Sequence, residues 1–129
     1  MELPVVNHPD YVAKINDDNK FPIKKFGALA EYLLKEGVVK KFYIPKECSI
    51  KTMQTSHSLE YINHIRNKSL DIKLQNRIGF PINDSVARRS FVATGGTVLA
   101  SKLALDSRLA CNTAGGSHHA TFDCGAGYC

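Results

Sequence analysis

The sequence contains no apolar stretch long enough to cross a membrane. Its apolar runs are only a few residues long, whereas a bilayer-spanning helix needs roughly 20 apolar residues. The first residues, MELPVVNHPDY, also lack the basic start of a signal peptide, because the acid Glu2 stands where bases are expected. These absences predict a soluble protein that is neither exported nor embedded in a membrane, and we expect it in the cytoplasm.

A disulfide framework is also missing. The four cysteines, Cys48, Cys111, Cys124 and Cys129, show no regular spacing, and small secreted disulfide domains carry a higher density of cysteine. We therefore expect reduced thiols. Cys48 has no histidine or cysteine nearby at metal-binding spacing, so we expect it to be structural.

No basic residue follows Arg108, although 17 lysines and arginines give the chain a formal net charge of +5. These bases alternate with acids and with apolar positions, which is typical of a solvated surface and argues against direct binding of nucleic acid. The local cluster formed by Lys40, Lys41, Lys46 and Lys51 favours acidic partners only weakly.

The length of 129 residues and the 43% hydrophobic content fit a single domain, without an internal repeat or a linker. Short apolar runs predict strands at 3–6 and 109–114, and helical periodicity predicts helices over 21–36, 59–65 and 86–106. Residues 70–75 fit either a short helix or an alternating strand, with a helix favoured. This order of elements predicts an α/β fold in which helices cover a parallel sheet.

Particular residues support this assignment. The first long helix should bury a face made of Ile23, Phe26, Ala30, Leu33 and Leu34. Within the last helix, the pair Gly95–Gly96 costs roughly 1 kcal/mol per residue relative to alanine. We therefore expect this thin face to press against a sheet or another helix.

Isolated histidines in the first half of the chain are expected to be structural. His8 precedes a proline and should make a hydrogen bond in a turn. His57 and Tyr61 have the i, i+4 spacing that could build a site. They lack a third ligand at metal-binding spacing, so we expect packing or surface roles for both.

The carboxyl-terminal segment, CNTAGGSHHATFDCGAGYC at 111–129, carries most of the residues capable of chemistry. Gly115 and Gly116 allow a tight turn before two adjacent imidazoles, His118 and His119. Neighbouring residues of a regular strand point to opposite faces, so two histidines that act together must lie on an irregular loop.

The motif NTAGGSHHA at 112–120, followed by GAGYC at 125–129, resembles the signature of the histone-deacetylase-like zinc amidohydrolases. The resemblance extends upstream through NHPDY at 7–11, KFPIKKFGALAEYL at 20–33, RIGFP at 77–81 and RRSFVATGGTVLASKLAL at 88–105, in the order of that family's N-terminal half. The sequence is most similar to the bacterial and class IV branches.

The resemblance implies an arginase-like, three-layer α/β fold and hydrolysis of an acyl amide, typically acetyl-lysine, with zinc as the cofactor. It assigns proton transfer to His118 and His119. It also assigns the wall of the acyl-lysine tunnel to Gly127 and Tyr128, followed by Cys129. The implied substrate is an acylated lysine or a polyamine.

The sequence departs from the family pattern at several points. The family's zinc ligands, two aspartates and a histidine, and its carbonyl-polarising tyrosine follow the last matched motif and have no counterpart in this chain. Tyr128 replaces the more usual phenylalanine, and Ala126 replaces a larger residue. We therefore expect residues 1–129 to form one incomplete deacetylase-like domain that is inactive alone.

Two alternatives remain open from the sequence. The chain could be a non-catalytic binding module, or a module that pairs with a separate C-terminal half or another oligomer partner. Alternatively, His118, His119, Asp123, Cys124 and Cys129 could form a small metal site of their own, although their spacing matches no closed structural pattern.

Overall fold

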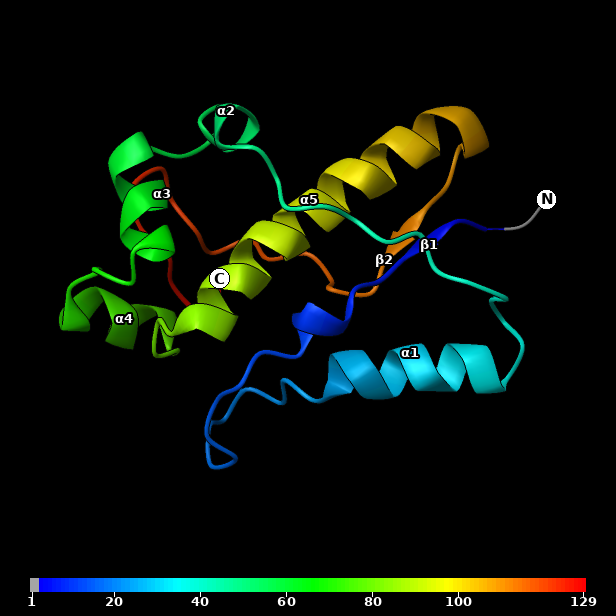
Figure 1. Ribbon diagram of the computed structural model, residues 1–129, viewed down its shortest axis with the longest axis horizontal. Helices are drawn as coiled ribbons and strands as arrows, with labels where there is room; N and C mark the ends of the chain where they lie inside the picture. The colour runs from blue at the N-terminus through cyan, green and yellow to red at the C-terminus, as the bar shows by residue number, and fades with distance from the viewer. Residues whose placement is uncertain (1–2) are drawn as a thin grey trace.

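Helix α5, Asp84–Ser107, crosses the molecule and contacts elements from both halves of the chain (Figure 1). In the computed structural model, which describes residues 3–129, it packs against both strands, the 3-10 helix η1 and helix α3. Met1 and Glu2, which contribute to the signal-peptide argument, lie outside the described residues. The long helix predicted over 86–106 is therefore confirmed, and it organises the fold.

The other elements are short. In chain order they are β1 (Val5–Val6), η1 (Pro9–Tyr11), α1 (Lys25–Lys35), α2 (Ile50–Met53), α3 (Leu59–Arg66), α4 (Ile72–Ile78) and β2 (Cys111–Asn112). The predicted strands at 3–6 and 109–114 are thus present but shorter, and the ambiguous segment at 70–75 enters a helix. The elements η1 and α2 were not predicted.

The two strands form a parallel sheet, in which Val5 pairs with Cys111 and Val6 with Asn112. Tyr43 adds an isolated parallel bridge to Val6, so β1 lies between Tyr43 and β2. Since α5 packs against both strands, the α/β class and the parallel, helix-covered sheet predicted from the sequence are confirmed.

Helix α1 begins later than predicted. Asn19 accepts a hydrogen bond from the backbone N–H of Phe21 and donates one to the carbonyl of Gly79. These contacts hold the segment before the helix in a turn. On α1 itself, Phe26 and Ala30 are buried as predicted, whereas Leu34 is 46% exposed.

Helices α3, α4 and α5 each start at a polar residue whose side chain accepts a backbone N–H: Ser58, Asp71 and Asn83. Such caps satisfy donors that the helix itself leaves unpaired. At its other end, α4 stops at Gly79, whose φ of 91° is left-handed and favours glycine.

The glycine pair in α5 lies where two segments approach the helix most closely. A Cβ on Gly95 would come 1.9 Å from the carbonyl oxygen of Lys46, and one on Gly96 would come 2.0 Å from the Tyr11 hydroxyl. Since that hydroxyl donates to the Asn112 side chain of β2, Gly96 allows α5 to press against the sheet. The predicted thin face is confirmed.

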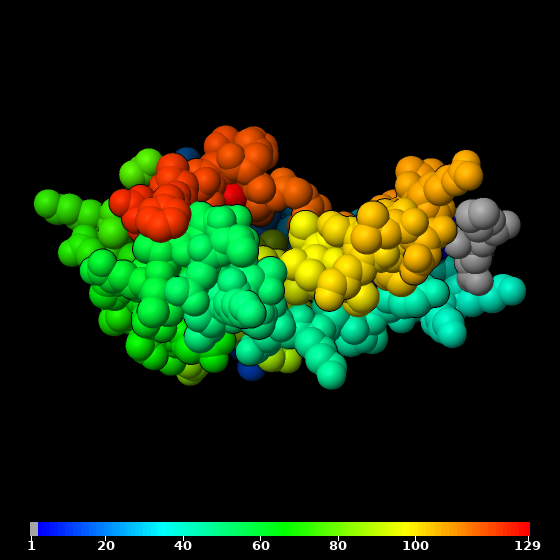
Figure 2. Space-filling view, turned by 90° about the horizontal axis from the view of Figure 1, so that it is seen from above, coloured from blue at the N-terminus to red at the C-terminus, as the bar shows by residue number. Residues whose placement is uncertain are grey.

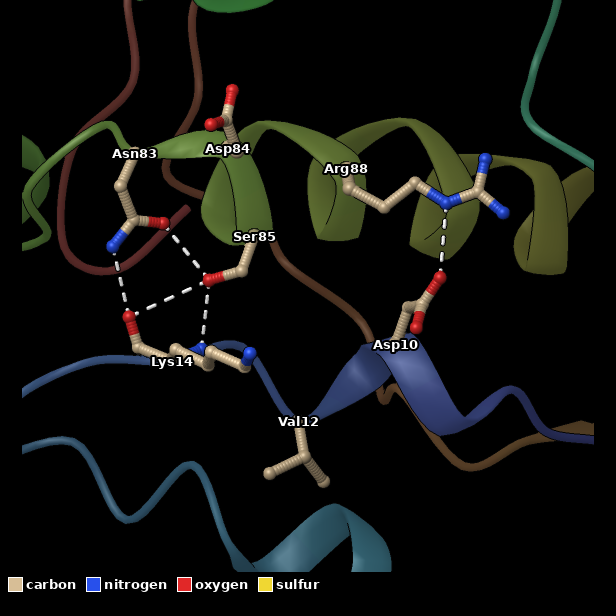
Figure 3. Close-up of a pocket in the computed structure, with 7 residues that line it drawn as sticks. All are labelled: Asp10, Val12, Lys14, Asn83, Asp84, Ser85 and Arg88. Atoms are coloured by element: carbon tan, nitrogen blue, oxygen red, sulfur yellow. Dashed lines mark hydrogen bonds and ion pairs between the residues drawn. The ribbon is translucent and has the colours of Figure 1, made fainter.

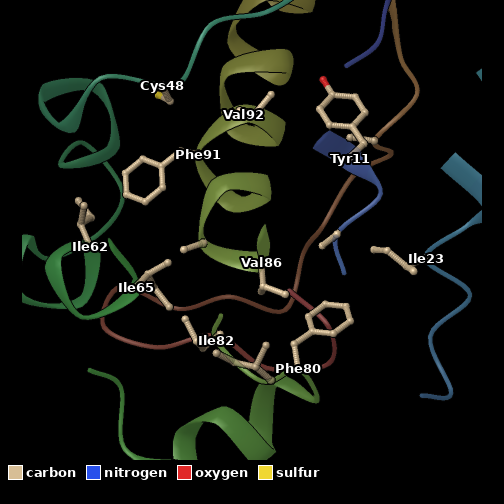
Figure 4. Packing of buried hydrophobic residues seen from close by; sticks show 14 of the residues in the cluster. Tyr11, Ile23, Cys48, Ile62, Ile65, Phe80, Ile82, Val86, Phe91 and Val92 are labelled. Carbon is tan, nitrogen blue, oxygen red and sulfur yellow. The ribbon is translucent and has the colours of Figure 1, made fainter. Parts of the chain in front are cut away.

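The core lies between α5 and the elements around it (Figure 4). Tyr11 and Val92 are its most buried large side chains. Fully burying one aliphatic side chain contributes roughly 1.5–3 kcal/mol, so this cluster holds the short elements in place. Cys48 is also buried, as expected of a structural cysteine, and its backbone N–H donates to the carbonyl of Phe91.

The remaining predictions about single residues are settled by their contacts. His8 accepts a hydrogen bond from the backbone N–H of Asp10 at 3.0 Å, as a turn residue should.

Although α5 is 24 residues long, neither it nor any other helix within residues 3–129 is apolar enough over a sufficient length to cross a membrane.

Candidate active site

The segment after β2 turns at Gly115 and leads to the two adjacent histidines. Gly115 has a φ of 73°, and its N–H donates to the carbonyl of Asn112. Its neighbour Gly116 does not require a left-handed conformation, so only the first glycine of the pair is needed for the turn. Thr113 and Ala114 anchor the start of the turn in the interior.

His118 and His119 lie next to each other on an irregular loop. Their ring centroids are 4.1 Å apart with an interplanar angle of 39°, and both residues are exposed. The loop carries no helix or strand, which matches the conformation expected for two neighbouring histidines that face one site.

Cys129 and Gly127 hold the histidine loop against the end of the chain. The Cys129 sulfur accepts hydrogen bonds from the backbone N–H groups of His119 and Ala120, at 3.3 and 3.2 Å. A Cβ on Gly127 would come 3.1 Å from the His119 ring, and its φ of 53° is left-handed. A larger residue at 127 would therefore displace the second histidine.

Tyr128 lies in an aromatic cluster beside the histidines. Its ring stacks on Phe21 with centroids 5.0 Å apart and lies 5.4 Å from Phe80. Its backbone N–H donates to the carbonyl of Ile78 at the end of α4. The ring covers Gly79 so closely that a Cβ there would lie 2.7 Å from it. The terminating glycine of α4 thus makes room for Tyr128.

Helix α3 supports the same segment from the other side, as Figure 2 shows where the carboxyl-terminal residues lie against it. The His57 Nδ1–H donates to the carbonyl of Thr121 at 2.8 Å, and the Ser58 N–H donates to that of Phe122 at 2.9 Å. Burial raises the pKa of Tyr61 to about 12. Both residues have packing roles, as the sequence predicted, and these roles bring them next to the candidate site.

These residues line a cavity of about 470 Å³ that is partly open to solvent. Its wall includes the two histidines, Gly127, Tyr128, Cys129 and the aromatic side chains Phe21 and Phe26. The structure thus brings together all the site residues suggested by the sequence motif. A cavity of this size is in the range of ligand pockets.

Arg89 completes the wall, and sequence reasoning missed it. This residue of α5 is only 9% exposed, and its Nε donates to the carbonyl of Tyr11 at 2.9 Å. Its guanidinium lies 4.9 Å from the ring centroid of Phe26. Burial lowers the pKa of Arg89, while the neighbouring Tyr11 and Cys129 oppose that shift. The only sequence signal was a base on the otherwise buried face of α5.

The residues described here do not form a metal site on their own. No group of three or more histidine, cysteine, aspartate or glutamate side chains within residues 3–129 could hold a metal ion. The alternative in which the histidines bind a metal together with Asp123, Cys124 and Cys129 is therefore wrong for this structure.

A larger cavity, of about 550 Å³, lies between the amino-terminal segment and the start of α5 (Figure 3). Its charged groups are largely paired: Arg88 bonds Asp10 at 2.9 Å and also bonds Glu47. Ser85 accepts the backbone N–H of Lys14 at 2.8 Å. These contacts hold the amino-terminal segment on α5. Because the polar groups of this cavity already bond one another, the smaller cavity beside the histidines is the better candidate for an active site.

The motif residues and their arrangement agree with the comparison with known families. The histone deacetylase domain model matches residues 20–129. This chain belongs to the histone deacetylase domain family, a family of deacetylase-like hydrolases, and membership implies an arginase-like fold.

Two relatives show how much of the domain is represented. An uncharacterized protein of Picosynechococcus sp. is 41% identical over 131 residues, covering 100% of this chain and 44% of the relative. Histone deacetylase 2 of Arabidopsis thaliana is 27% identical over 125 residues, covering 84% of this chain and 30% of the relative. The chain therefore spans less than half the length of either relative.

Proposed function

We propose that this chain supplies the proton-transfer histidines and part of the acyl-binding wall of a zinc-dependent deacylase. In this proposal His118 and His119 are the catalytic residues, and Gly127 and Tyr128 contact the acyl group. The substrate is an acylated amine, either a protein lysine or a polyamine. The zinc ligands and the carbonyl-polarising tyrosine belong to a segment outside these 129 residues, so the chain alone is inactive.

The chemistry required of the two histidines is proton transfer. Hydrolysis of an amide needs one group to accept a proton from the attacking water and one to deliver a proton to the leaving amine. Imidazole suits both tasks near neutral pH.

The observation that carries this proposal is the close approach of the His118 and His119 rings, with centroids 4.1 Å apart, at the cavity that Gly127 and Tyr128 also line. Two imidazoles at one cavity can divide the duties of base and acid. The glycine leaves space for a ligand beside His119, and the aromatic ring offers an apolar surface to an acyl chain.

The direct test is reconstitution. The chain is co-expressed with the part of the Picosynechococcus relative that it does not cover, and zinc-dependent hydrolysis of an acetyl-lysine peptide and an acetylated polyamine is measured. His118→Ala and His119→Ala should each lower kcat by about 10²–10⁴-fold. His64→Ala changes a half-buried histidine of α3 that does not line the cavity and should leave kcat unchanged. Full activity in both site variants would refute the assigned roles.

A second candidate function is a non-catalytic module that binds or complements another polypeptide. It is favoured by two exposed apolar side chains: Leu105, in the last turn of α5, is 85% exposed, and Leu109, just before β2, is 69% exposed. Exposed apolar groups beside a strand edge are typical of a protein contact. If the two co-expressed parts never co-purify, this candidate fails.

A further inference from the structure

Arg89 is a buried cation without an anionic partner. Within residues 3–129 its side chain makes one hydrogen bond, from Nε to the carbonyl of Tyr11, and it forms no ion pair with any carboxylate. Its neighbour Arg88, in contrast, bonds two carboxylates at the surface. Arg89 is only 9% exposed, and an ion with so little exposure is costly to leave without a counter-charge. No fully buried side-chain nitrogen within residues 3–129 lacks a hydrogen-bond partner, so the terminal nitrogens of Arg89 that make no hydrogen bond are open to a ligand in the cavity that Arg89 lines.

The cavity that Arg89 lines has a one-sided charge. Lys25 lies at the same wall, with its ammonium 4.9 Å from the ring centroid of Phe21. No aspartate or glutamate is among the lining residues. Every fixed side-chain charge around this space is therefore positive, and the field inside it favours an anion.

The surroundings of Arg89 are suited to a carboxylate in particular. Its planar guanidinium offers two parallel donors to a carboxylate, and such charge-assisted pairs are about twice as strong as neutral hydrogen bonds. The aromatic ring of Phe26, 4.9 Å from the guanidinium, limits the approach of water on one side. The Nε bond to Tyr11 holds the side chain in place and leaves the terminal nitrogens for a ligand.

We infer that Arg89 binds the terminal carboxylate of an acidic acyl chain, so that this site takes amides of dicarboxylic acids, such as succinyl amides. The inference rests on the proposed function, because it assumes that the cavity receives the acyl group of an amide substrate. An acetyl group has no charge with which to pair Arg89. A cavity of about 470 Å³ also has room for a longer chain.

The test measures binding to the unmodified chain without turnover, so its outcome is independent of any hydrolytic activity. N-methylsuccinamic acid, its uncharged amide N-methylsuccinamide, and acetate are titrated while backbone amide resonances are followed by NMR. The acid should bind at least tenfold more tightly than the amide and than acetate. It should shift the resonances of Gly115, Gly127 and His119, which line the cavity.

Variants locate the interaction. Arg89→Gln should weaken binding of the acid at least tenfold, Arg89→Lys should weaken it less, and the matched control Arg88→Gln should not change it. Equal binding of acid and uncharged amide, or an unchanged dissociation constant in a folded Arg89→Gln variant, would overturn the inference. Equal binding of acetate would also overturn it, since a product carboxylate would then be the ligand. Should Arg89→Gln fail to fold, the ligand comparison and the shifted resonances of the unmodified chain decide.

Discussion

Replacing Gly95 with alanine tests whether close contact with the 46–48 segment, rather than helix propensity, governs this position of α5. The new Cβ would lie 1.9 Å from the Lys46 carbonyl oxygen and 3.0 Å from the Cys48 nitrogen. Alanine gains about 1 kcal/mol of helix propensity over glycine. Overpacking costs about 1–3 kcal/mol. Moving the 46–48 segment also weakens the hydrogen bond of 2.9 Å from the Cys48 N–H to the Phe91 carbonyl, which contributes about 1 kcal/mol.

The net expectation is a loss of about 1–3 kcal/mol in the free energy of unfolding, which lowers Tm by roughly 5–10 °C in a domain of this size. Thermal and urea unfolding followed by circular dichroism measure both quantities. Gly27→Ala is the matched control, because its Cβ would lie 3.3 Å from a flexible Val12 methyl group. That variant should be neutral or slightly stabilised. A Gly95→Ala protein as stable as Gly27→Ala would refute the packing argument.

Three further predictions concern other contacts. Gly79→Ala should strain a left-handed residue and displace Tyr128, whose ring its Cβ would approach to 2.7 Å; a loss of near-ultraviolet dichroism checks this, and an unchanged spectrum contradicts it. Burial raises the pKa of Tyr11 and of Tyr61 to about 12, above 10.0. Above pH 10 the unfolded chain therefore binds fewer protons than the folded one, and unfolding measurements should show stability falling between pH 10 and 12; stability that rises there would exclude these shifts. Asn83→Ala removes the cap of α5 and should cost about 1 kcal/mol in urea unfolding, whereas an unaltered midpoint would show that the cap contributes nothing.

The positions of the helices along the chain could largely be predicted from local sequence patterns. Apolar spacing acts over three to four residues, so the long helix α5 could be predicted from the sequence. The start of α1 could not, because the contacts of Asn19 with Phe21 and Gly79 keep the preceding residues in a turn. The second of these contacts joins positions far apart in the chain.

The candidate site also combines features that the sequence determined with features that only the structure decided. The sequence alone determined the family, the irregular loop that presents His118 and His119, and the need for a thin face at Gly95 and Gly96. Only the tertiary structure decided that Arg89 lines the cavity without an anionic partner. The physical reason is that burial and charge pairing depend on the whole set of neighbouring side chains, which local sequence spacing does not encode.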